Sequence, residues 1–291
     1  MTTAGIEQIA VIGAGNMGHQ ISLCAALAGY RVRCADVSPQ VLQKAEAFAD
    51  SYLVERVAKG KLAEEAAKRA RANIAFTASI EEAVGDADFV IEAILEKLEL
   101  KRELFAQLDA ICPPHTILAT NSSYIVSSKI ADATKRADKV CNMHFFNPAL
   151  VMKLVEVVRG PHVSSATAET TMEVARSMGK TPVLLKKEIY GFLVNRVLTA
   201  IKQEALYLHD MGVASFEDID AAVENGLGHP MGPFRLMDLT GIDLSYHVSM
   251  ERYRETGDMA LKPSPTLVEK YTRGEWGRKT GKGFYDHAKD K

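Results

Sequence analysis

The stretch QIAVIGAGNMG, residues 8–18, decides the fold of the N-terminal part of this 291-residue chain. Its first half is a short apolar run that predicts a buried β-strand, and its second half has the glycine spacing G-x-G-x-x-G. Residues 17–30 then have helical spacing and stop at Gly29. The sequence therefore predicts a strand, a glycine-rich turn and a helix in direct succession.

This turn has the features of a dinucleotide-binding site. The first glycine permits a tight turn, the second lets the backbone approach a pyrophosphate, and the third allows close helix–strand packing. The following helix N-terminus offers free N–H groups and positive dipole to the anion. A glycine-rich turn without a ligand is the alternative. The candidate contacts are Gly13, Gly15, Asn16, Met17 and Gly18.

Asp36 ends the next predicted strand, about 20 residues after the turn. A carboxylate at this place accepts hydrogen bonds from ribose hydroxyls and repels a 2′-phosphate, so NAD is favoured over NADP. Arg33 lies close by in the sequence and leaves the preference between the two nucleotides open.

Short apolar runs alternate with helical segments up to residue 187, and this alternation predicts a parallel sheet with helices on both faces. One long charged helical stretch is expected from about Pro39 to Ala72. From Gly191 onward the pattern is helical throughout. We therefore predict an α/β fold, with a Rossmann-type, mostly parallel sheet in residues 1–187 and an all-helical C-terminal domain in residues 188–291. The expected strands are residues 8–15, 31–37, 73–77, 87–95, 115–120, 140–146, 153–159 and 182–186.

Composition limits the classes of partner. The chain has 35 basic and 37 acidic side chains, which gives no support to nucleic-acid binding. The first residues lack a basic region followed by an apolar core, so we expect no secretory signal. An apolar run of about 18 residues is also absent, so we expect no membrane span. The four cysteines lie in apolar contexts without C-x-x-C spacing, which favours reduced thiols in a cytoplasmic protein over disulfides or a metal site.

His144 and Glu156 are polar residues in two neighbouring apolar strands. His144 is expected at a strand end, in the half of the sheet where the strand order could reverse, and ligands bind at such ends. We expect strand ends at one edge to bring Glu156 to it. A carboxylate on the imidazole Nδ1–H would prepare the ring to take a proton from an alcohol. Polar groups satisfied within the core are the alternative, and the residues alone leave both possibilities open.

Several longer segments resemble the successive signature segments of the 3-hydroxyacyl-CoA dehydrogenase family. The resemblance runs nearly end to end, and the chain length suits the single-function bacterial type, often called 3-hydroxybutyryl-CoA dehydrogenase. It implies an enzyme that oxidises (S)-3-hydroxyacyl-CoA, of short acyl chain, with NAD. The similar segments are residues 13–18, 90–109, 119–124, 144–160, 191–208, 228–243 and 274–287.

The resemblance also implies roles for single residues. His144 would be the general base and Glu156 its orienting carboxylate. Ser123 would hydrogen-bond the substrate hydroxyl, and Asn195 would complete the site from the helical domain. Residues around the cofactor or the pantetheine arm of the substrate would be Glu96, Lys101, Asn121, Asn147 and Lys279, with Lys101 also serving the substrate.

The chain departs from the family pattern at two places. Tyr124 stands where the family usually has Ser, and the larger side chain would narrow or reshape the acyl pocket. Tyr52 stands about where the family can offer a Ser to coenzyme A, but Lys59 still suits a phosphate. Neighbouring basic residues could assist Lys59 or form an ordinary solvated helix face. They are Arg56, Lys61, Lys68, Arg69 and Arg71.

Two rival functions remain open. A related NAD-dependent dehydrogenase of a free hydroxy acid or sugar acid would keep the glycine turn and His144, with less use for Lys59. A catalytically silent NAD-binding protein would have no need of a His144–Glu156 pair. The apolar helical domain also predicts a homodimer formed through it.

Overall fold

The computed structural model describes residue 3 and residues 5–288, and the chain divides into two compact units. The N-terminal unit is Met1–Leu193 and the helical unit is Val194–Lys291. Within the described residues, no helix is long and apolar enough to cross a membrane.

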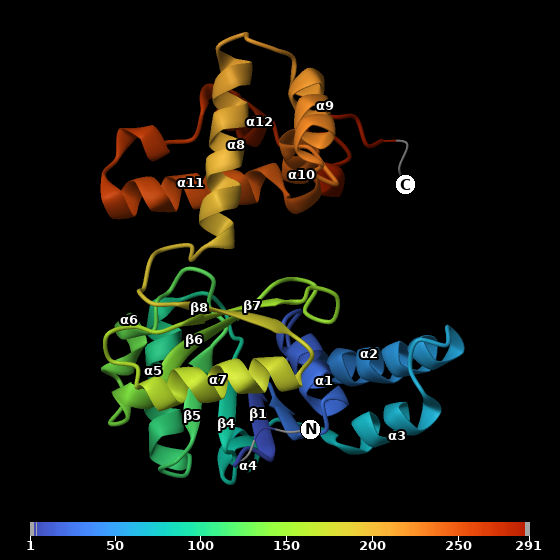
Figure 1. Ribbon diagram of the computed structural model, residues 1–291, viewed down its shortest axis with the longest axis vertical. Helices are drawn as coiled ribbons and strands as arrows, with labels where there is room; N and C mark the ends of the chain where they lie inside the picture. Colours follow the sequence, from blue (N-terminus) through green and yellow to red (C-terminus); the bar gives the residue numbers. More distant parts are fainter. Residues whose placement is uncertain (1–2, 4, 289–291) are drawn as a thin grey trace. The chain divides into compact units, whose positions relative to one another are not determined.

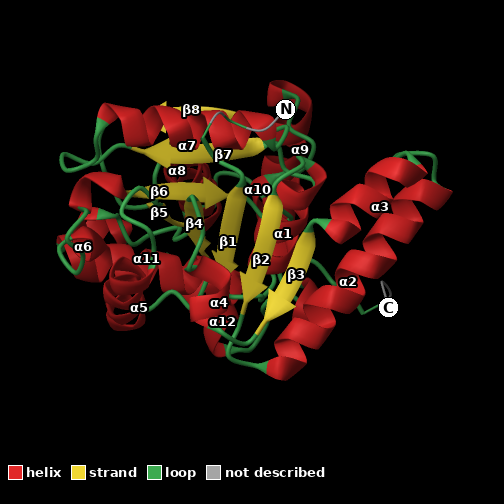
Figure 2. Ribbon diagram, turned by 90° about the horizontal axis from the view of Figure 1, so that it is seen from below, coloured by secondary structure: helices red, strands yellow, loops and turns green. Residues whose placement is uncertain are grey.

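Among the described residues, eight strands form one sheet in the N-terminal unit (Figure 2). Their order is β3-β2-β1-β4-β5-β6-β7-β8, and β1 to β6 run parallel to one another. β7 runs antiparallel to β6, and β8 is parallel to β7. The predicted Rossmann-type, mostly parallel sheet is confirmed. The strands are β1 (Gln8–Ile12), β2 (Arg31–Ala35), β3 (Ile74–Thr77), β4 (Phe89–Glu92), β5 (Ile117–Thr120), β6 (Val140–Phe145), β7 (Leu154–Val158) and β8 (Thr181–Leu185).

Helices cover both faces of the sheet (Figure 1). Ile9 and Val11 of β1 pack into one core with α1, α2, α3 and α7, whereas Ala10 and Ile12 pack into a second core with α4, α5 and α6. A strand buried on both faces needs apolar residues at every position, which explains the unbroken apolar run. The helices of this unit are α1 (Gly18–Leu27), α2 (Pro39–Ala58), α3 (Glu64–Ala72), α4 (Ile80–Val84), α5 (Leu98–Ile111), α6 (Ser128–Ala131), η1 (Ala137–Lys139) and α7 (Ser165–Ser177).

The single helical stretch predicted for residues 39–72 is in fact two helices, α2 and α3. The break follows Lys59, the C-cap of α2, and Gly60 has a φ of +64°. This left-handed conformation is accessible to glycine at little cost, so Gly60 ends the helix and lets the chain reverse.

The strand order reverses at β1, which lies between β2 and β4. The expectation that His144 lies in the half of the sheet where the order reverses is therefore wrong in detail, because His144 is on β6, two strands beyond β4. The carboxyl end of β1, where the glycine turn begins, marks the reversal point instead, and open α/β sheets bind ligands there.

The helical unit contains five α-helices and two short 3₁₀ turns in its described residues (Figure 1). Ser215 caps α9, because its hydroxyl accepts the N–H of Asp218 at 3.1 Å, and Pro233 begins α10. Both features agree with the sequence, and the all-helical C-terminal part is confirmed. The elements are α8 (Val194–Asp210), α9 (Phe216–Leu227), α10 (Pro233–Thr240), α11 (Ile242–Thr256), η2 (Met259–Leu261), α12 (Pro265–Thr272) and η3 (Arg278–Thr280).

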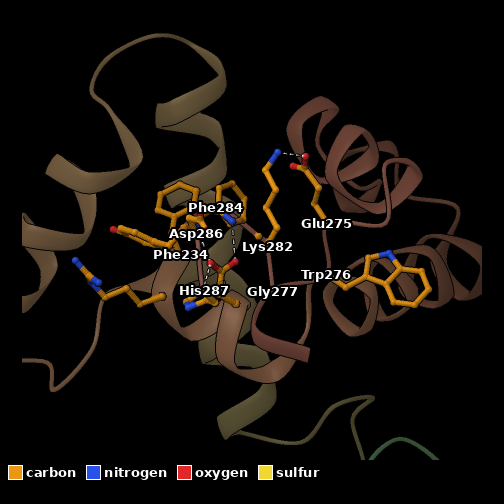
Figure 3. A network of polar contacts seen from close by, with 12 residues as sticks. Phe234, Glu275, Trp276, Gly277, Lys282, Phe284, Asp286 and His287 are labelled. Carbon is orange, nitrogen blue, oxygen red and sulfur yellow. Dashed lines mark hydrogen bonds and ion pairs between the residues drawn. The ribbon is translucent and has the colours of Figure 1, made fainter. Parts of the chain in front are cut away.

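The end of the helical unit is held by a buried carboxylate (Figure 3). Asp238 of α10 accepts the backbone N–H groups of Phe284 and Tyr285, both at 2.9 Å, and contacts His287 Nε2 at 2.9 Å. Nearby, Glu275 pairs with Lys270 and Lys282, which lowers its pKa to about 2. The last described segment is therefore fixed to α10 by charge-assisted hydrogen bonds.

Candidate active site

In the glycine turn, the backbone packs closely against other backbone atoms at two glycines, whereas the space next to the third glycine is open. Gly13 has a φ of +99°, and a Cβ there would lie 2.6 Å from the carbonyl oxygen of Ala93. A Cβ on Gly18 would lie 1.7 Å from the carbonyl oxygen of Gly13, whereas one on Gly15 would meet nothing within 4 Å. The turn thus leaves open space at the glycine expected to face a pyrophosphate.

The N-terminus of α1 has no side-chain cap, with Met17 at the N-cap position. The N–H of His19 already donates to the carbonyl oxygen of Gly15 at 3.2 Å, and the positive end of the helix dipole suits a phosphate. Asn16 donates from Nδ2 to Oδ1 of Asn147 at 3.2 Å, which ties the turn to the β6–β7 connection. These residues fit a dinucleotide.

The Asp36 carboxylate accepts the N–H of Ala14 at 2.8 Å and that of Ser38 at 2.9 Å. It is half-buried, and each oxygen has a second lone pair for a ribose hydroxyl. The Arg33 guanidinium donates to the Asp86 carboxylate and to the carbonyl oxygen of Glu82. Arg33 is thus already engaged, which favours a nucleotide without a 2′-phosphate.

His144 and Glu156 face each other across the antiparallel β6–β7 pair. His144 Nδ1 lies 2.9 Å from Glu156 Oε2, and the two residues are 3% and 0% exposed. The pairing predicted from sequence is correct, but its geometric reason was wrong. The two residues are direct cross-strand neighbours, not residues on converging strand ends.

The other side of the imidazole contacts Ser123, whose Oγ lies 3.1 Å from His144 Nε2. With Glu156 on Nδ1, we assign the proton of a neutral ring to Nδ1, so that Nε2 accepts the Ser123 hydroxyl. A carboxylate–imidazole–hydroxyl series suits either proton abstraction or acyl transfer. The dinucleotide turn on the same sheet favours proton abstraction coupled to hydride transfer.

Phe192 is a contact of His144 that sequence reasoning missed. Its ring centroid is 5.4 Å from that of the imidazole, and the ring is fully buried. Phe192 has a φ of +46°, a strained conformation for this residue type, and the next N–H, of Leu193, donates to Glu156 Oε1 at 3.0 Å. The pair Gly191-Phe192 before a helix was the available signal.

Glu92 is a second residue that sequence reasoning missed. It is fully buried, and its Oε1 accepts Lys101 Nζ at 2.6 Å and the N–H of Ile94 at 2.7 Å. Its Oε2 accepts the Thr120 hydroxyl at 2.6 Å. A carboxylate ending an apolar strand, with a lysine nine positions on, could have indicated this pair. Lys101 is only 1% exposed, so it lies beneath the site and not at its surface.

Glu96 fixes the turn that carries Ser123. Its Oε1 accepts the N–H groups of Ser123 and Tyr124, both at 3.1 Å, and the Ser122 hydroxyl. Its Oε2 lies 3.4 Å from Lys101 Nζ. Lys101 therefore links the buried Glu92 to the exposed Glu96, and through Glu96 to the residue that contacts His144.

Asn121 also joins two strand ends, because its Oδ1 accepts the N–H of Phe145 at 2.8 Å. The N-terminal unit thus brings together the predicted residues at the carboxyl ends of its central strands. Lys59 stands apart at the end of α2, where it pairs with Glu55 on the exposed helix surface.

The basic group around Lys59 is largely compensated by neighbouring acids. Lys68 pairs with Glu64, and Arg71 pairs with Glu46 and Asp50. Arg56 lies over the Tyr52 ring, 5.7 Å from its centroid. These contacts favour an ordinary solvated face for much of the group.

Two predicted site residues lie in the helical unit. Asn195 is in the first turn of α8, where its carbonyl oxygen accepts the Thr199 hydroxyl at 2.6 Å. Lys279 pairs with Asp243 and lies over the Trp276 ring. In the part of the chain that the structure describes, no group of three or more His, Cys, Asp or Glu residues is arranged to hold a metal ion.

A Rossmann-type sheet with a dinucleotide turn and a buried imidazole–carboxylate pair is typical of an NAD-dependent dehydrogenase, and this is the class that the fold and site indicate. Residues 8–189 match the NAD-binding domain of 3-hydroxyacyl-CoA dehydrogenase, and residues 191–287 match its C-terminal domain. The chain belongs to the 3-hydroxyacyl-CoA dehydrogenase family and is an NAD-dependent enzyme.

Relatives extend this result over nearly the whole chain. The probable 3-hydroxybutyryl-CoA dehydrogenase of Bacillus subtilis is 43% identical over 97% of this chain and 98% of its own. The mitochondrial hydroxyacyl-coenzyme A dehydrogenase of Homo sapiens is 38% identical, over 97% and 91%. The crystal structure of (S)-3-hydroxybutyryl-CoA dehydrogenase from Ralstonia eutropha superposes with a TM-score of 0.92 at 36% identity, over 97% and 99%.

Proposed function

We propose that this enzyme oxidises short-chain (S)-3-hydroxyacyl-CoA to 3-oxoacyl-CoA, with His144 as the general base. The observation that carries the proposal is the unbroken series of contacts from Glu156 through His144 to Ser123. A neutral imidazole whose Nδ1–H is held by a carboxylate presents Nε2 as a proton acceptor.

In the oxidation, the C3 hydroxyl would give its proton to His144 Nε2. The C3–H bond would break with its electron pair leaving as hydride, and the C3–O bond would become a carbonyl. NAD, when bound, supplies the acceptor of that hydride. Glu156 would stabilise the imidazolium, because its carboxylate is already in contact with Nδ1 and is shielded from water.

The remaining residues would orient the substrate. The Ser123 hydroxyl would move its hydrogen bond from His144 to the substrate hydroxyl. Asn195 would donate to the thioester carbonyl, and preorganised donors of this kind are often the largest electrostatic contribution to catalysis. Glu96 and Lys101 would act by holding the Ser123 turn in place, since Lys101 is buried beneath it.

The proposed cofactor contacts are those of the glycine turn and the strand ends around it. We propose residues 1–187 as the NAD-binding domain and residues 188–291 as the substrate and dimerisation domain. Lys59 would receive a phosphate of coenzyme A. The residues proposed to hold NAD are Gly13, Gly15, Asn16, Met17, Gly18, Asp36, Glu96, Asn121, Ser123, Asn147 and Lys279.

Short acyl chains are supported by the names of the bacterial relatives and by one contact near the base. Tyr124 directly follows Ser123 in the chain, and its ring centroid lies 4.9 Å from that of Tyr190. Two aromatic rings beside the reacting group would limit the room for a long acyl chain.

We further propose a homodimer formed through the helical unit and a cytoplasmic location. Exposed apolar side chains along this unit support the dimer; they include Val197, Tyr207, Met211, Leu239 and Leu244. The four cysteines are free and buried, and burial raises the pKa of the Cys141 thiol to about 11, which suits a reducing compartment.

The substrate class is tested by comparing NADH-dependent reduction of acetoacetyl-CoA with that of free acetoacetate, at equal concentrations. We expect kcat/KM to favour the thioester by more than about 100-fold, because the coenzyme A arm supplies binding energy that the free acid lacks. A preference for the free acid would contradict the proposal and favour a dehydrogenase of free hydroxy acids.

A further inference from the structure

A cavity of about 680 Å³ lies at the carboxyl ends of β7 and β8, within the N-terminal unit. Its wall consists of two short segments that follow these strands, together with one side chain of β8. The lining residues are 159–161, Leu184 and 186–188. Sites for small molecules are usually cavities of roughly 300–1,000 Å³, so this cavity has room for a ligand larger than a single phosphate ion.

The cavity is separate from the place of the proposed reaction. β7 and β8 run antiparallel to β6, so their carboxyl ends lie at the edge of the sheet where β6 begins (Figure 2). His144 is near the carboxyl end of β6, toward the other edge. Of the residues of this unit that we propose to contact NAD or the substrate, none lines the cavity. A ligand bound here would therefore be additional to both.

Three cations, Arg159, Lys186 and Lys187, line the cavity. Arg159 follows β7 and Lys186 follows β8. The N–H of Arg159 donates to the carbonyl oxygen of Leu185 at 2.9 Å, so the two cations leave neighbouring strands side by side. Like charges in facing positions of neighbouring strands are destabilising. Within the described residues, none of the three cations has a carboxylate at ion-pair distance, so an anion between them would relieve this repulsion.

Among the described residues that line the cavity, Glu188 is the one acid, and it is already engaged. Its Oε1 accepts the N–H of Ser128 at 2.8 Å and the hydroxyl of Ser127 at 3.0 Å, at the start of α6. The carboxylate also lies against Gly160, where an added Cβ would be 2.7 Å from Oε1. The cavity wall therefore keeps an excess of positive charge, which suits an anion with more than one negative charge.

The cavity also has an apolar side, formed by Leu184 and Pro161. Leu184 is 37% exposed, and Pro161 is exposed as well. Contact with these side chains would contribute nothing to the binding of an inorganic ion. It would remove apolar surface from water if the ligand carried a ring or a sugar beside its charged groups.

We propose that this cavity binds a phosphorylated small molecule, with its phosphate groups between Arg159, Lys186 and Lys187. The planar guanidinium of arginine can donate two parallel hydrogen bonds to a phosphate, and the two lysines add point charges beside it. Leu184 and Pro161 would contact the uncharged part of the ligand, such as the ribose and base of a nucleotide. The proposal does not depend on the reaction at His144, so either can fail without the other.

The test is a calorimetric titration of the enzyme saturated with NADH, so that the dinucleotide site is filled. The probes are ADP, pyrophosphate and adenosine. We expect ADP to bind once per chain and adenosine, which has no phosphate, not to bind. Arg159→Met and Lys186→Met should each raise the Kd for ADP by about 10- to 100-fold, the usual effect of losing a charged hydrogen bond. ADP binding at least about 10-fold tighter than pyrophosphate would identify a nucleotide as the ligand, and equal binding would identify the phosphate groups alone.

Two control variants separate this cavity from other places where ADP could bind. Lys135→Met changes an exposed lysine of the same unit, and Lys59→Met changes the residue proposed to receive a phosphate of coenzyme A. Both should leave the Kd for ADP unchanged. A loss in Lys59→Met as large as that in Arg159→Met would place ADP at the coenzyme A site and overturn the proposal. Wild-type enzyme that binds neither ADP nor pyrophosphate, or unchanged affinity in both Arg159→Met and Lys186→Met, would overturn it as well.

Discussion

Two buried pairs of polar side chains in the N-terminal unit differ in what surrounds them. In the first, Lys101 and Glu92 are almost fully buried, and the carboxylate accepts hydrogen bonds at both oxygens from the surrounding chain. In the second, Glu156 holds His144, and among the described residues the hydrogen-bond partner of His144 Nε2 is the Ser123 hydroxyl, which can turn away. One pair is closed within the protein, whereas the other keeps a nitrogen for a ligand.

The difference assigns the two pairs different tasks. A closed pair stabilises the local structure, because both oxygens of the carboxylate have hydrogen-bond partners. Removing one partner leaves a buried charge without compensation. An open pair contributes chemistry, because a proton can arrive at Nε2 while Glu156 compensates the new charge. Changing the first pair should therefore affect stability before activity, and changing the second should affect activity before stability.

The largest expected effect is on turnover in His144→Gln. Glutamine keeps a donor toward Glu156 but cannot take a proton, so kcat should fall by about 100- to 10,000-fold. Steady-state rates with acetoacetyl-CoA and a fluorescence titration with NADH would measure both properties, and NADH affinity should be nearly unchanged. His115→Gln, at an exposed position, is the control. Near-wild-type turnover in His144→Gln would remove His144 from the mechanism and break the comparison.

The next effect is on stability in Lys101→Met. The substitution leaves Glu92 buried without its countercharge, and the free energy of unfolding should fall by about 3–5 kcal/mol. Urea denaturation of the N-terminal unit, followed by circular dichroism, would measure it. Lys68→Met removes an exposed ion pair and should cost less than about 1 kcal/mol. Equal stabilities for the two variants would show that the closed pair contributes nothing beyond a surface pair.

The smallest effect concerns the nucleotide preference set by Asp36. This carboxylate accepts two backbone N–H groups and keeps lone pairs for a ligand. Asp36→Ala should lower the NAD-to-NADP ratio of kcat/KM by about 10-fold, because one acceptor for the ribose hydroxyls and one repulsive charge are lost together. Asp86→Ala is a matched comparison, since it frees Arg33 without touching the turn. An unchanged ratio in Asp36→Ala would show that another group decides the nucleotide preference.

Local patterns predicted the elements well, because each strand is a short apolar run between turn residues. The position of individual residues within the sheet was harder to predict from the sequence. The His144–Glu156 pair was predicted from residue type, yet the antiparallel direction of β7 is set by a connection too short for a crossover helix, and that reasoning was not applied. The split at Gly60 was missed because helical spacing continues on both sides of it.

Burial was the hardest property to predict. Lys101 was expected to contact ligands because of the family resemblance, and its own residue type suggested the helix surface, where lysines usually lie. Its burial below the site is explained by the ion pair with the buried Glu92. Phe192 was not singled out because an aromatic residue near a helix start is ordinary in sequence. Its role depends on a left-handed backbone that brings one ring against His144.

The antiparallel register of β6 and β7 also governs how this site tolerates insertions. His144 stands opposite Glu156, and a slip of one residue would place Val155 or Val157 there instead, on the wrong face of the sheet. The connection between the strands, residues 146–153, can lengthen without moving the pair, provided that β7 keeps its register. Added residues within β7 cannot be absorbed in this way. In an insertion scan of the hairpin, enzymes with insertions in the connection should therefore keep their activity. Enzymes with insertions within β7 should lose it.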